Sequence, residues 1–291
     1  MSHPQPHCHF HRFCPTAGRP YSGSFTARCL LLLVLLICLP SADAMARKKD
    51  KRKNANGTPE LVEPDAMAAK AAKERRAVTP EAAHTHKAGF INTKYREGID
   101  VSHYQGVIDW QRVVKSANIS YAYLKATEGA TYVDDTYERN LREAREAGLS
   151  VGSYHFYRPN VAPQVQFENI KTNIKIEEQD LVPIIDIETR GTVSDAQFIA
   201  DLKELIRLVE RHFGKKPLLY TYQNFYNRHL CGQFKSYHWM MAKYQDEQPI
   251  LSDGRDYIMW QYTAKGSIDG IRGHVDRSRI MPGFKLKQVG M

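Results

Sequence analysis

The sequence predicts an α/β fold: an irregular (β/α) barrel whose helices are reduced in the later part. From residue 95 onward, short apolar runs alternate with amphipathic stretches, which is typical of a parallel sheet with helices outside it. The number of apolar runs predicts that the sheet closes into a barrel. Residues 95–291 are fewer than the ~250 of a full eightfold barrel, and helices between the later runs are short or missing, so we expect an irregular form.

The apolar runs and amphipathic stretches place the expected elements in order. Strands are expected at Gly98–Val101, Ile119–Lys125, Ser150–Tyr157, Leu181–Glu188, Leu218–Thr221, Trp239–Ala242 and Tyr257–Tyr262. Helices are expected at Asp135–Ala147, at Gln164–Ile174, and from Ser194 or Asp195 to about Gly214. Helical spacing of the apolar residues supports the first and third helices, Ser or Asp can cap the third one, and Gly stops the first and third.

Two acids at the end of one predicted strand are the strongest functional signal. Residues 183–188 read Pro-Ile-Ile-Asp-Ile-Glu, and side chains two residues apart on a strand point to the same face. Most acid pairs are solvated, but a buried strand rarely ends in two acids without a reason. Acids placed together separate in pKa, so we expect a depressed pKa for Asp186 and a raised one for Glu188. Such a pair can cut a glycosidic bond.

Polar and aromatic residues gather at the carboxyl ends of the other strands, where barrels of this kind carry their function. They are Asp100, His103, Lys125, Thr127, Glu128, His155, Tyr157, Tyr220, Tyr222, Trp239, Tyr244, Trp260, Gln261, Tyr262 and Asp276. Aromatic rings stack on the apolar faces of sugars, while carboxylates and amides bind hydroxyls. The lining therefore favours a linear carbohydrate, and the sequence has no GxxxxGK[ST] or GxGxxG phosphate-binding motif.

The first 44 residues are expected to form a signal peptide with an extended leading region. An apolar stretch at 30–39 follows Arg28 and precedes the small-x-small site Ala42-Asp43-Ala44, and it is too short to span a bilayer comfortably. We therefore expect a secreted or periplasmic protein, with lipid anchoring at Cys38 as the alternative. Of the five cysteines only Cys231 follows the expected cut, so no intramolecular disulfide is expected.

Residues 45–94 are expected to form a basic, disordered linker. A run of basic residues spans 47–53, and residues 45–87 have no Phe, Tyr or Trp, so this part cannot bury enough apolar surface to fold alone. Part of the net charge of +9 belongs to it. We expect a solvated tether with no specific partner, because blocks of charge are usually disordered. The alternative for an exported protein is an anionic wall or membrane surface as the partner, rather than nucleic acid.

The motifs together resemble the glycoside hydrolase family 25 lysozymes. The similar segments are Gly98–Ser102 with Gln105-Gly106 and Asp109-Trp110, Tyr123–Gly129, Gly152–Tyr157, Asp186–Glu188, Tyr220-Thr221, and Trp260–Tyr262 followed by Gly270 and Val275-Asp276. They follow the family's order across the whole predicted domain, 95–291. Each motif is weak by itself, but six in register are specific. The resemblance implies a flattened, TIM-like barrel and hydrolysis of the β-1,4 bond from N-acetylmuramic acid to N-acetylglucosamine in peptidoglycan.

The resemblance also implies roles for particular residues, with no metal and no cofactor. Glu188 would be the general acid and base, and Asp186 would support attack by the substrate's own N-acetyl group. Asp100 and Asp276 match the family's other two acidic positions. Substrate contacts are expected from Lys125, Glu128, His155, Tyr157, Tyr220, Tyr222, Trp239, Trp260 and Gln261. A monomer is the default expectation.

Two other classes of function stay open at this point. One is a peptidoglycan-binding module that kept the cleft but lost turnover, although all four acids are present. The other is a metal-dependent deacetylase or amidase that uses Asp100, His103 and His155. Within residues 95–291 the sequence has no His-x-x-x-His or His-x-x-Glu-His spacing to support such a metal site.

Overall fold

The protein forms a closed barrel of eight strands. The computed structural model describes residues 88–291, so the expected signal peptide and most of the expected linker lie outside the described residues. The strands are β1 (Glu97–Val101), β2 (Ile119–Glu128), β3 (Tyr132–Val133), β4 (Ser150–Phe156), β5 (Ile184–Asp186), β6 (Leu218–Tyr222), β7 (Trp239–Ala242), β8 (Met259–Gly266) and β9 (Val275–Ile280). Around the barrel they follow the order β1-β9-β8-β7-β6-β5-β4-β2, and β2 pairs with β1 to close the ring. The short strand β3 pairs only with β2.

The sheet is not wholly parallel, which corrects the sequence-based expectation. Strand β9 runs antiparallel to both of its neighbours, β1 and β8. Its sequence, Val-Asp-Arg-Ser-Arg-Ile, contains three charged residues and does not read as an apolar run. The charged side chains are accommodated because they lie at the cleft or on the outer surface, while Val275, Ser278 and Ile280 are buried. Strand β9 was therefore missed in the sequence.

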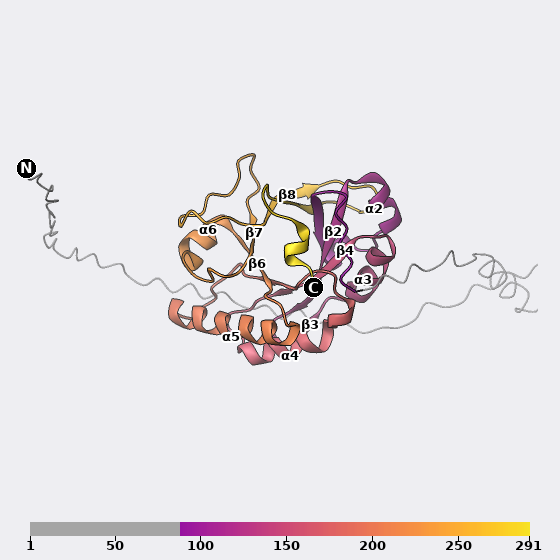
Figure 1. Cartoon of the computed structure of the whole chain (residues 1–291). Coiled ribbons are helices and arrows are strands. Elements are labelled where there is room, and N and C mark those ends of the chain that lie inside the picture. The colour runs from indigo at the N-terminus through magenta and orange to yellow at the C-terminus, as the bar shows by residue number, and fades with distance from the viewer. Residues whose placement is uncertain (1–87) are drawn as a thin grey trace, which may run out of the picture. The chain divides into compact units, whose positions relative to one another are not determined.

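Helices cover only part of the barrel (Figure 1). They are α2 (Trp110–Ser116), α3 (Tyr137–Glu146), α4 (Pro163–Asn173), α5 (Asp195–Phe213) and α6 (Gln223–Phe225), with short turns η1 (His103–Gln105), η2 (Ile176–Glu178), η3 (Tyr226–Leu230) and η4 (Leu286–Val289). Helices α4 and α5 pack side by side. After β6 the only α-helical segment within residues 88–291 is the single turn α6, which confirms the expected reduction of the later helices. None of the described helices is long and apolar enough to span a bilayer.

The longest helix, α5, shows how the sequence sets the limits of an element. The side chain of Ser194 caps its start by accepting a hydrogen bond from the backbone N–H of Gln197 (3.2 Å). The helix ends at Gly214, whose φ of 68° is the left-handed conformation that favours glycine. The helix buries one apolar stripe, made of Phe198, Leu202, Leu205, Ile206, Val209 and Phe213.

Two apolar clusters pack on the inner and outer faces of the barrel sheet. The inner cluster fills the barrel and includes Tyr121, Tyr123 and Met240, while the outer cluster lies between the strands and the helices. The two tyrosines fit inside because glycines face them. A Cβ atom added to Gly98 or Gly152 would lie 2.3 Å or 2.4 Å from the ring of Tyr121 or Tyr123, respectively.

The two ends of the described chain meet at the amino ends of the strands. The backbone N–H of Phe90 donates to Asp180 Oδ1 (3.1 Å), and the N–H of Met291 donates to the Asp180 carbonyl (3.0 Å). Leu286 and Val289, in the last turn η4, are almost fully buried in the inner cluster. The carboxyl-terminal segment therefore packs against the lower end of the barrel interior and leaves the opposite end for the cleft.

Candidate active site

Four carboxyl groups line one cavity at the carboxyl ends of the strands. Asp100 lies in β1, Asp276 lies opposite it in β9 as its cross-strand partner, Asp186 ends β5, and Glu188 follows two residues later. The cavity has a volume of about 230 Å³. The i, i+2 spacing thus brings Asp186 and Glu188 to the same cavity, and the closed ring adds the other two acids to them.

A hydrogen-bond network fixes Asp100 in this cavity. Gln261 Nε2 donates to both carboxylate oxygens of Asp100, at 2.9 Å each. The hydroxyls of Tyr220 and Tyr244 donate to Gln261 Oε1 at 2.8 and 2.7 Å. Because two donors hold the amide oxygen, the amide nitrogen is turned toward the carboxylate. Gln261 therefore positions Asp100, and the tyrosines position Gln261.

The environment raises the pKa of all four acids. Burial is the largest cause for each of them. The charge of Asp276 further raises the pKa of Asp100 and of Glu188. Hydrogen bonding between Asp100 and Asp276 raises the pKa of the first and lowers that of the second, which favours a proton on Asp100. The cavity therefore retains protons at a pH at which exposed carboxyls are ionised.

The depressed pKa expected for Asp186 is wrong. Burial, followed by the charges of Glu188 and Asp100, raises the pKa of Asp186, and the charge of Lys125 only partly opposes this rise. Its Oδ1 atom is buried and has no hydrogen-bond partner among the described residues. Sequence spacing predicts that two acids interact, but the pKa of each depends on the surrounding charges and on burial.

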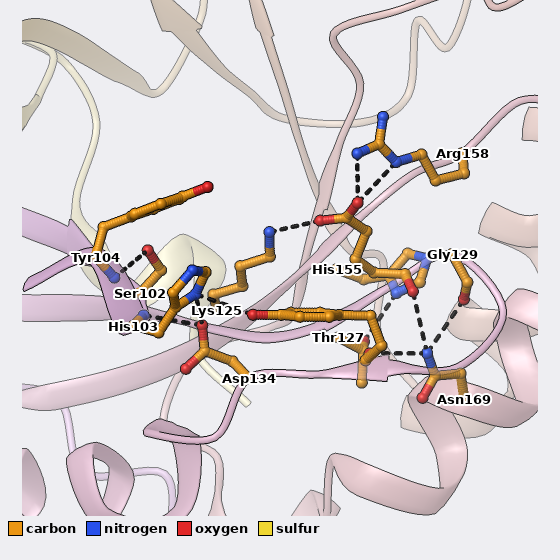
Figure 2. A network of polar contacts seen from close by, with 12 residues as sticks. Ser102, His103, Tyr104, Lys125, Thr127, Gly129, Asp134, His155, Arg158 and Asn169 are labelled. Carbon is orange, nitrogen blue, oxygen red and sulfur yellow. Dashed lines mark hydrogen bonds and ion pairs between the residues drawn. The ribbon is translucent and has the colours of Figure 1, made fainter. Parts of the chain in front are cut away.

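Lys125, a cation on the cavity wall, is held by Glu128, a carboxylate outside the cavity (Figure 2). Lys125 Nζ donates to Glu128 Oε2 at 2.6 Å and lies 5.3 Å from the centre of the Phe156 ring. Arg158 Nε donates to Glu128 Oε1 at 2.8 Å. Burial alone would raise the pKa of Glu128, but the hydrogen bonds and charges of Lys125 and Arg158 outweigh it and lower the pKa. Glu128 does not line the cavity itself, so it acts through Lys125.

An aromatic group lies beside the cavity at the β1 side (Figure 2). Tyr104 lines the cavity and is 82% exposed, and its ring lies 4.1 Å from that of His103, centre to centre. Nδ1 of His103 lies 2.9 Å from Asp134 Oδ2 and 2.9 Å from the Tyr132 hydroxyl. Sequence reasoning missed Tyr104, because an exposed ring in a loop leaves no periodic signal. A Tyr two residues after the strand-end motif Asp-Val-Ser could have indicated it.

Several predicted contact residues do not reach the cavity, because they lie on the outer side of their strands. His155 is fully buried, 2.8 Å from Thr127 Oγ1 and 3.2 Å from Gln166 Oε1. Tyr157 and Trp239 are fully buried in the outer cluster. Trp260 belongs to the same cluster and donates through Nε1 to the Lys243 carbonyl (3.0 Å).

The placement of these four residues on the wrong face of the strands has one physical cause. Side chains alternate between the two faces of a strand, so neighbours one residue away reach the cavity instead. On β4 these are Tyr154 and Phe156, on β7 Met240, and on β8 Gln261. The predictions placed these residues in or next to the right strands. They chose the wrong face at His155, Tyr157, Trp239 and Trp260. Tyr220 and Gln261 do line the cavity.

A second depression adjoins the acidic cavity. It has a volume of about 330 Å³ and is lined by Tyr222, Asn224, Ala242, Tyr244 and Gln245, among others. Tyr244 lines both cavities. Tyr222 is 39% exposed and Tyr244 54% exposed. The predicted contact residue Tyr222 therefore lies in this neighbouring depression.

The arrangement matches that of a known enzyme family. Residues 99–271 match the model of glycosyl hydrolases family 25. The chain belongs to this family. It is 32% identical to lysozyme M1 of Streptomyces globisporus, over 66% of this chain and 70% of that protein. It is 38% identical to the uncharacterized protein YegX of Escherichia coli O157:H7, over 62% of this chain and 67% of that protein.

Solved structures agree with the family 25 assignment. A family 25 glycosyl hydrolase from Bacillus anthracis superimposes with a TM-score of 0.62 at 28% identity, over 72% of this chain and all of that one. A lysozyme from Streptomyces coelicolor does so with a TM-score of 0.59 at 27% identity, over 68% of this chain and 96% of that one. This family 25 protein is accordingly a glycoside hydrolase of the muramidase class, with a lysozyme-type barrel, and its substrate is peptidoglycan.

The family 25 site offers no arrangement for the amidase alternative. Within residues 88–291, no three His, Cys, Asp or Glu side chains are placed to hold a metal ion together. His155 is bonded to Thr127 and Gln166, and His103 to Asp134, so neither histidine joins Asp100 in the cavity. The free cysteine Cys231 packs against the outer cluster.

Proposed function

We propose that the cavity cleaves the β-1,4 bond between N-acetylmuramic acid and N-acetylglucosamine, with Glu188 as general acid. The observation that carries the proposal is the grouping of four carboxyls, in which burial and the charge of Asp276 raise the pKa of Glu188. A general acid must hold its proton at the working pH. Glu188 donates it to the leaving oxygen and then, as a carboxylate, activates the incoming water.

Asp186 is proposed to bind the substrate's N-acetyl group. Its buried Oδ1 atom has no partner among residues 88–291, and the hydroxyl of Tyr123, which lines the same cavity, is also without one. A buried acceptor without a donor is costly, and the amide N–H of an N-acetyl group would satisfy it. That hydrogen bond favours the ionised form of Asp186 and holds the acetyl oxygen for attack on the anomeric carbon.

Asp100 and Asp276 are proposed to set the charge of the site rather than to attack the substrate. Gln261 holds Asp100 through both oxygens, which leaves it little freedom to move. Asp276 raises the pKa of Glu188, so the pair helps to keep the general acid protonated.

The exposed aromatic side chains suggest a path for the glycan strand. Tyr104 follows β1, Tyr222 ends β6, and β1 and β6 are opposite each other in the ring of eight strands. Tyr244 connects the acidic cavity with the depression at Tyr222. A glycan chain that crosses the mouth of the barrel would pass the four acids. It would have an aromatic ring at either side on which its sugars could stack.

We propose that the protein is exported, because peptidoglycan lies outside the cytoplasm. The expected signal peptide lies outside the described residues. The basic run at 47–53, for which an anionic surface is one of the two predicted environments, lies outside them as well. Export, the surface partner and the monomeric state stay predictions.

The test is mass spectrometry of purified peptidoglycan digested with the full chain. We expect fragments with reducing-end N-acetylmuramic acid, and a loss of at least about a hundredfold in rate for Glu188→Gln. Glu177→Gln, at an exposed glutamate, is the matched control and keeps full activity. Intact glycan with released peptides or acetyl groups would indicate an amidase or deacetylase. Tight binding to the wall material without any cleavage would indicate the binding module.

A further inference from the structure

A cationic pocket lies at the end of the barrel opposite the acidic cavity. It is lined by segments that precede β5, β6 and β7 and by the last turn η4, and it includes Lys215, Lys216, His238 and Lys287. Its volume is about 290 Å³. Val182 in this pocket and Asp186 in the acidic cavity are four positions apart on one extended segment, or roughly 13 Å. The two sites are therefore distinct.

No Asp or Glu side chain among residues 88–291 lines this pocket. Two of the three lysines that line the pocket have backbone carbonyls as partners: Lys215 Nζ donates to the Gly290 carbonyl (3.4 Å) and Lys216 Nζ to the Ser236 carbonyl (3.3 Å). Gly290 follows η4 and Ser236 precedes β7, so the two ammonium groups are held by different segments of the chain. Glu210 accepts a hydrogen bond from Tyr237 (2.6 Å), the ring beneath Lys216, but it does not line the pocket.

The cations in and near the pocket affect the pKa of His238. Burial lowers the pKa of His238, and the charges of Arg255 and Lys216 lower it further. Cations gathered without counter-charges raise the local concentration of anions. A phosphate group suits several separate ammonium groups better than a carboxylate does, because it has more acceptor oxygens to share among them.

We propose that this lower pocket binds a phosphate group, carried either by an anionic lipid headgroup or by a soluble phosphate ester. Residues 88–91 lie at the same end of the barrel: the N–H of Gly89 donates to the Gln179 carbonyl, and Ile91 lies against Gly290 of the pocket wall. The basic run 47–53 precedes these residues in the sequence. When the phosphate belongs to a lipid headgroup, the acidic cavity lies at the opposite end of the barrel and faces away from the lipid surface.

The test compares two variants of the full chain with equal changes in charge. The pocket variant carries Lys215→Gln, Lys216→Gln and Lys287→Gln. The control carries Lys115→Gln, Lys203→Gln and Lys265→Gln, at exposed lysines outside the pocket. Thermal unfolding verifies that both variants are folded. The preceding basic residues are the same in each, so their contribution cancels.

One arm measures co-sedimentation with phosphatidylglycerol vesicles, and phosphatidylcholine vesicles serve as the neutral reference. We expect the pocket variant to bind at least about tenfold more weakly than wild type, and the control less than about threefold. The second arm adds glycerol phosphate and follows the His238 ring signal by NMR, identified by its absence in His238→Gln.

A difference between the variants in the vesicle arm alone assigns the site to headgroups. A difference in the soluble arm alone assigns it to a phosphate ester, and a difference in both shows that the phosphate group suffices. Equal binding by the two variants in both arms would overturn the proposal. None of these results depends on cleavage of peptidoglycan.

Discussion

At the scale of single residues, Lys125 is the cation that opposes proton retention in the acidic cavity. Among residues 88–291 it is the one Lys, Arg or His that lines the cavity. Its charge lowers the pKa of Asp186 and of Glu188 against the larger effect of burial. Glu128 holds it in place. The lysine thus limits how far the pKa of the general acid rises.

Replacement of this lysine should move the pH dependence of the enzyme. In Lys125→Met the pKa of Glu188 rises, so the acid keeps its proton to higher pH. The basic limb of kcat/KM against pH should therefore move upward, by roughly half to one unit. Peptidoglycan clearance between pH 4 and 9 measures it, with Lys171→Met at an exposed site as control. An unmoved limb, or one displaced to lower pH, would contradict this role.

His155 has a structural role that should be visible as pH-dependent stability. Burial lowers its pKa to about 4, below the ~6.5 of an unfolded chain. The unfolded state therefore binds the proton first, and the folded state loses stability as pH falls from about 6.5 to about 4. The free energy of unfolding should fall by about 3 kcal/mol from this group over that interval.

Denaturant unfolding of His155→Gln and of wild type at several pH values tests this contribution. The difference between the two in free energy of unfolding should change by about 3 kcal/mol between pH 7 and pH 4. The acid cluster is common to both proteins and cancels in the difference. His274→Gln, at an exposed histidine, should show no such change. A constant difference across this range would show that His155 is not buried in its neutral form.

At the scale of elements, the strands owe their inner packing to pairs of one tyrosine and one glycine. Tyr123 on β2 projects into the barrel next to Gly152 on β4, which is its partner in the strand register. An added Cβ at Gly152 would lie 2.4 Å from that ring. Tyr123 also lines the acidic cavity, so the glycine on β4 allows a ring of the active site to occupy its place.

Gly152→Ala should lower the free energy of unfolding by about 3 kcal/mol, because the ring and strand must move apart. In a Tyr123→Leu background the same substitution should cost markedly less, since the clashing ring is gone. Denaturant unfolding of the two single variants and the double variant gives the coupling energy. Strictly additive effects would show that the tyrosine ring is not the atom group that excludes a side chain at Gly152.

At the scale of the whole molecule, the barrel depends on its last residues. Leu286 and Val289 are buried in the inner cluster, and residues 88–91 lie beside this carboxyl-terminal segment. The closed ring provides two ends with opposite charge: acids line the cavity at the upper end and lysines line the lower pocket. The terminal segment therefore both completes the core and forms a wall of the cationic pocket.

Leu286→Ala should lower the free energy of unfolding by about 3 kcal/mol, as for other large-to-small changes in a core. Lys287→Ala, at the next residue along the chain and exposed, should change it by less than about 0.5 kcal/mol. Equilibrium unfolding in urea measures both. An equally small effect of the two substitutions would mean that the terminal turn is not part of the cooperative core.

The sequence by itself determined the kind of barrel, most of its strands and the four acids. Apolar periodicity reports burial, and a strand that ends in Asp-Ile-Glu sends both acids to one face, so Asp186 and Glu188 could be predicted from local spacing. The limits of α5 could also be predicted, because Ser194 and Gly214 act through local backbone geometry. The barrel rule placed Asp100 and Asp276 at the same rim, and the family resemblance matched them to the two other acidic positions of the site.

Only the tertiary structure decided which face of a strand meets the cavity, as the burial of His155 and the exposure of Tyr104 show. It also decided that β9 closes the ring in antiparallel orientation, and that the pKa of Asp186 is raised. The physical reason is the same in each case. Pairing, burial and charge depend on neighbours distant in sequence, and the lower pocket, which joins Lys216 to the last turn of the chain, exists only once the barrel has closed.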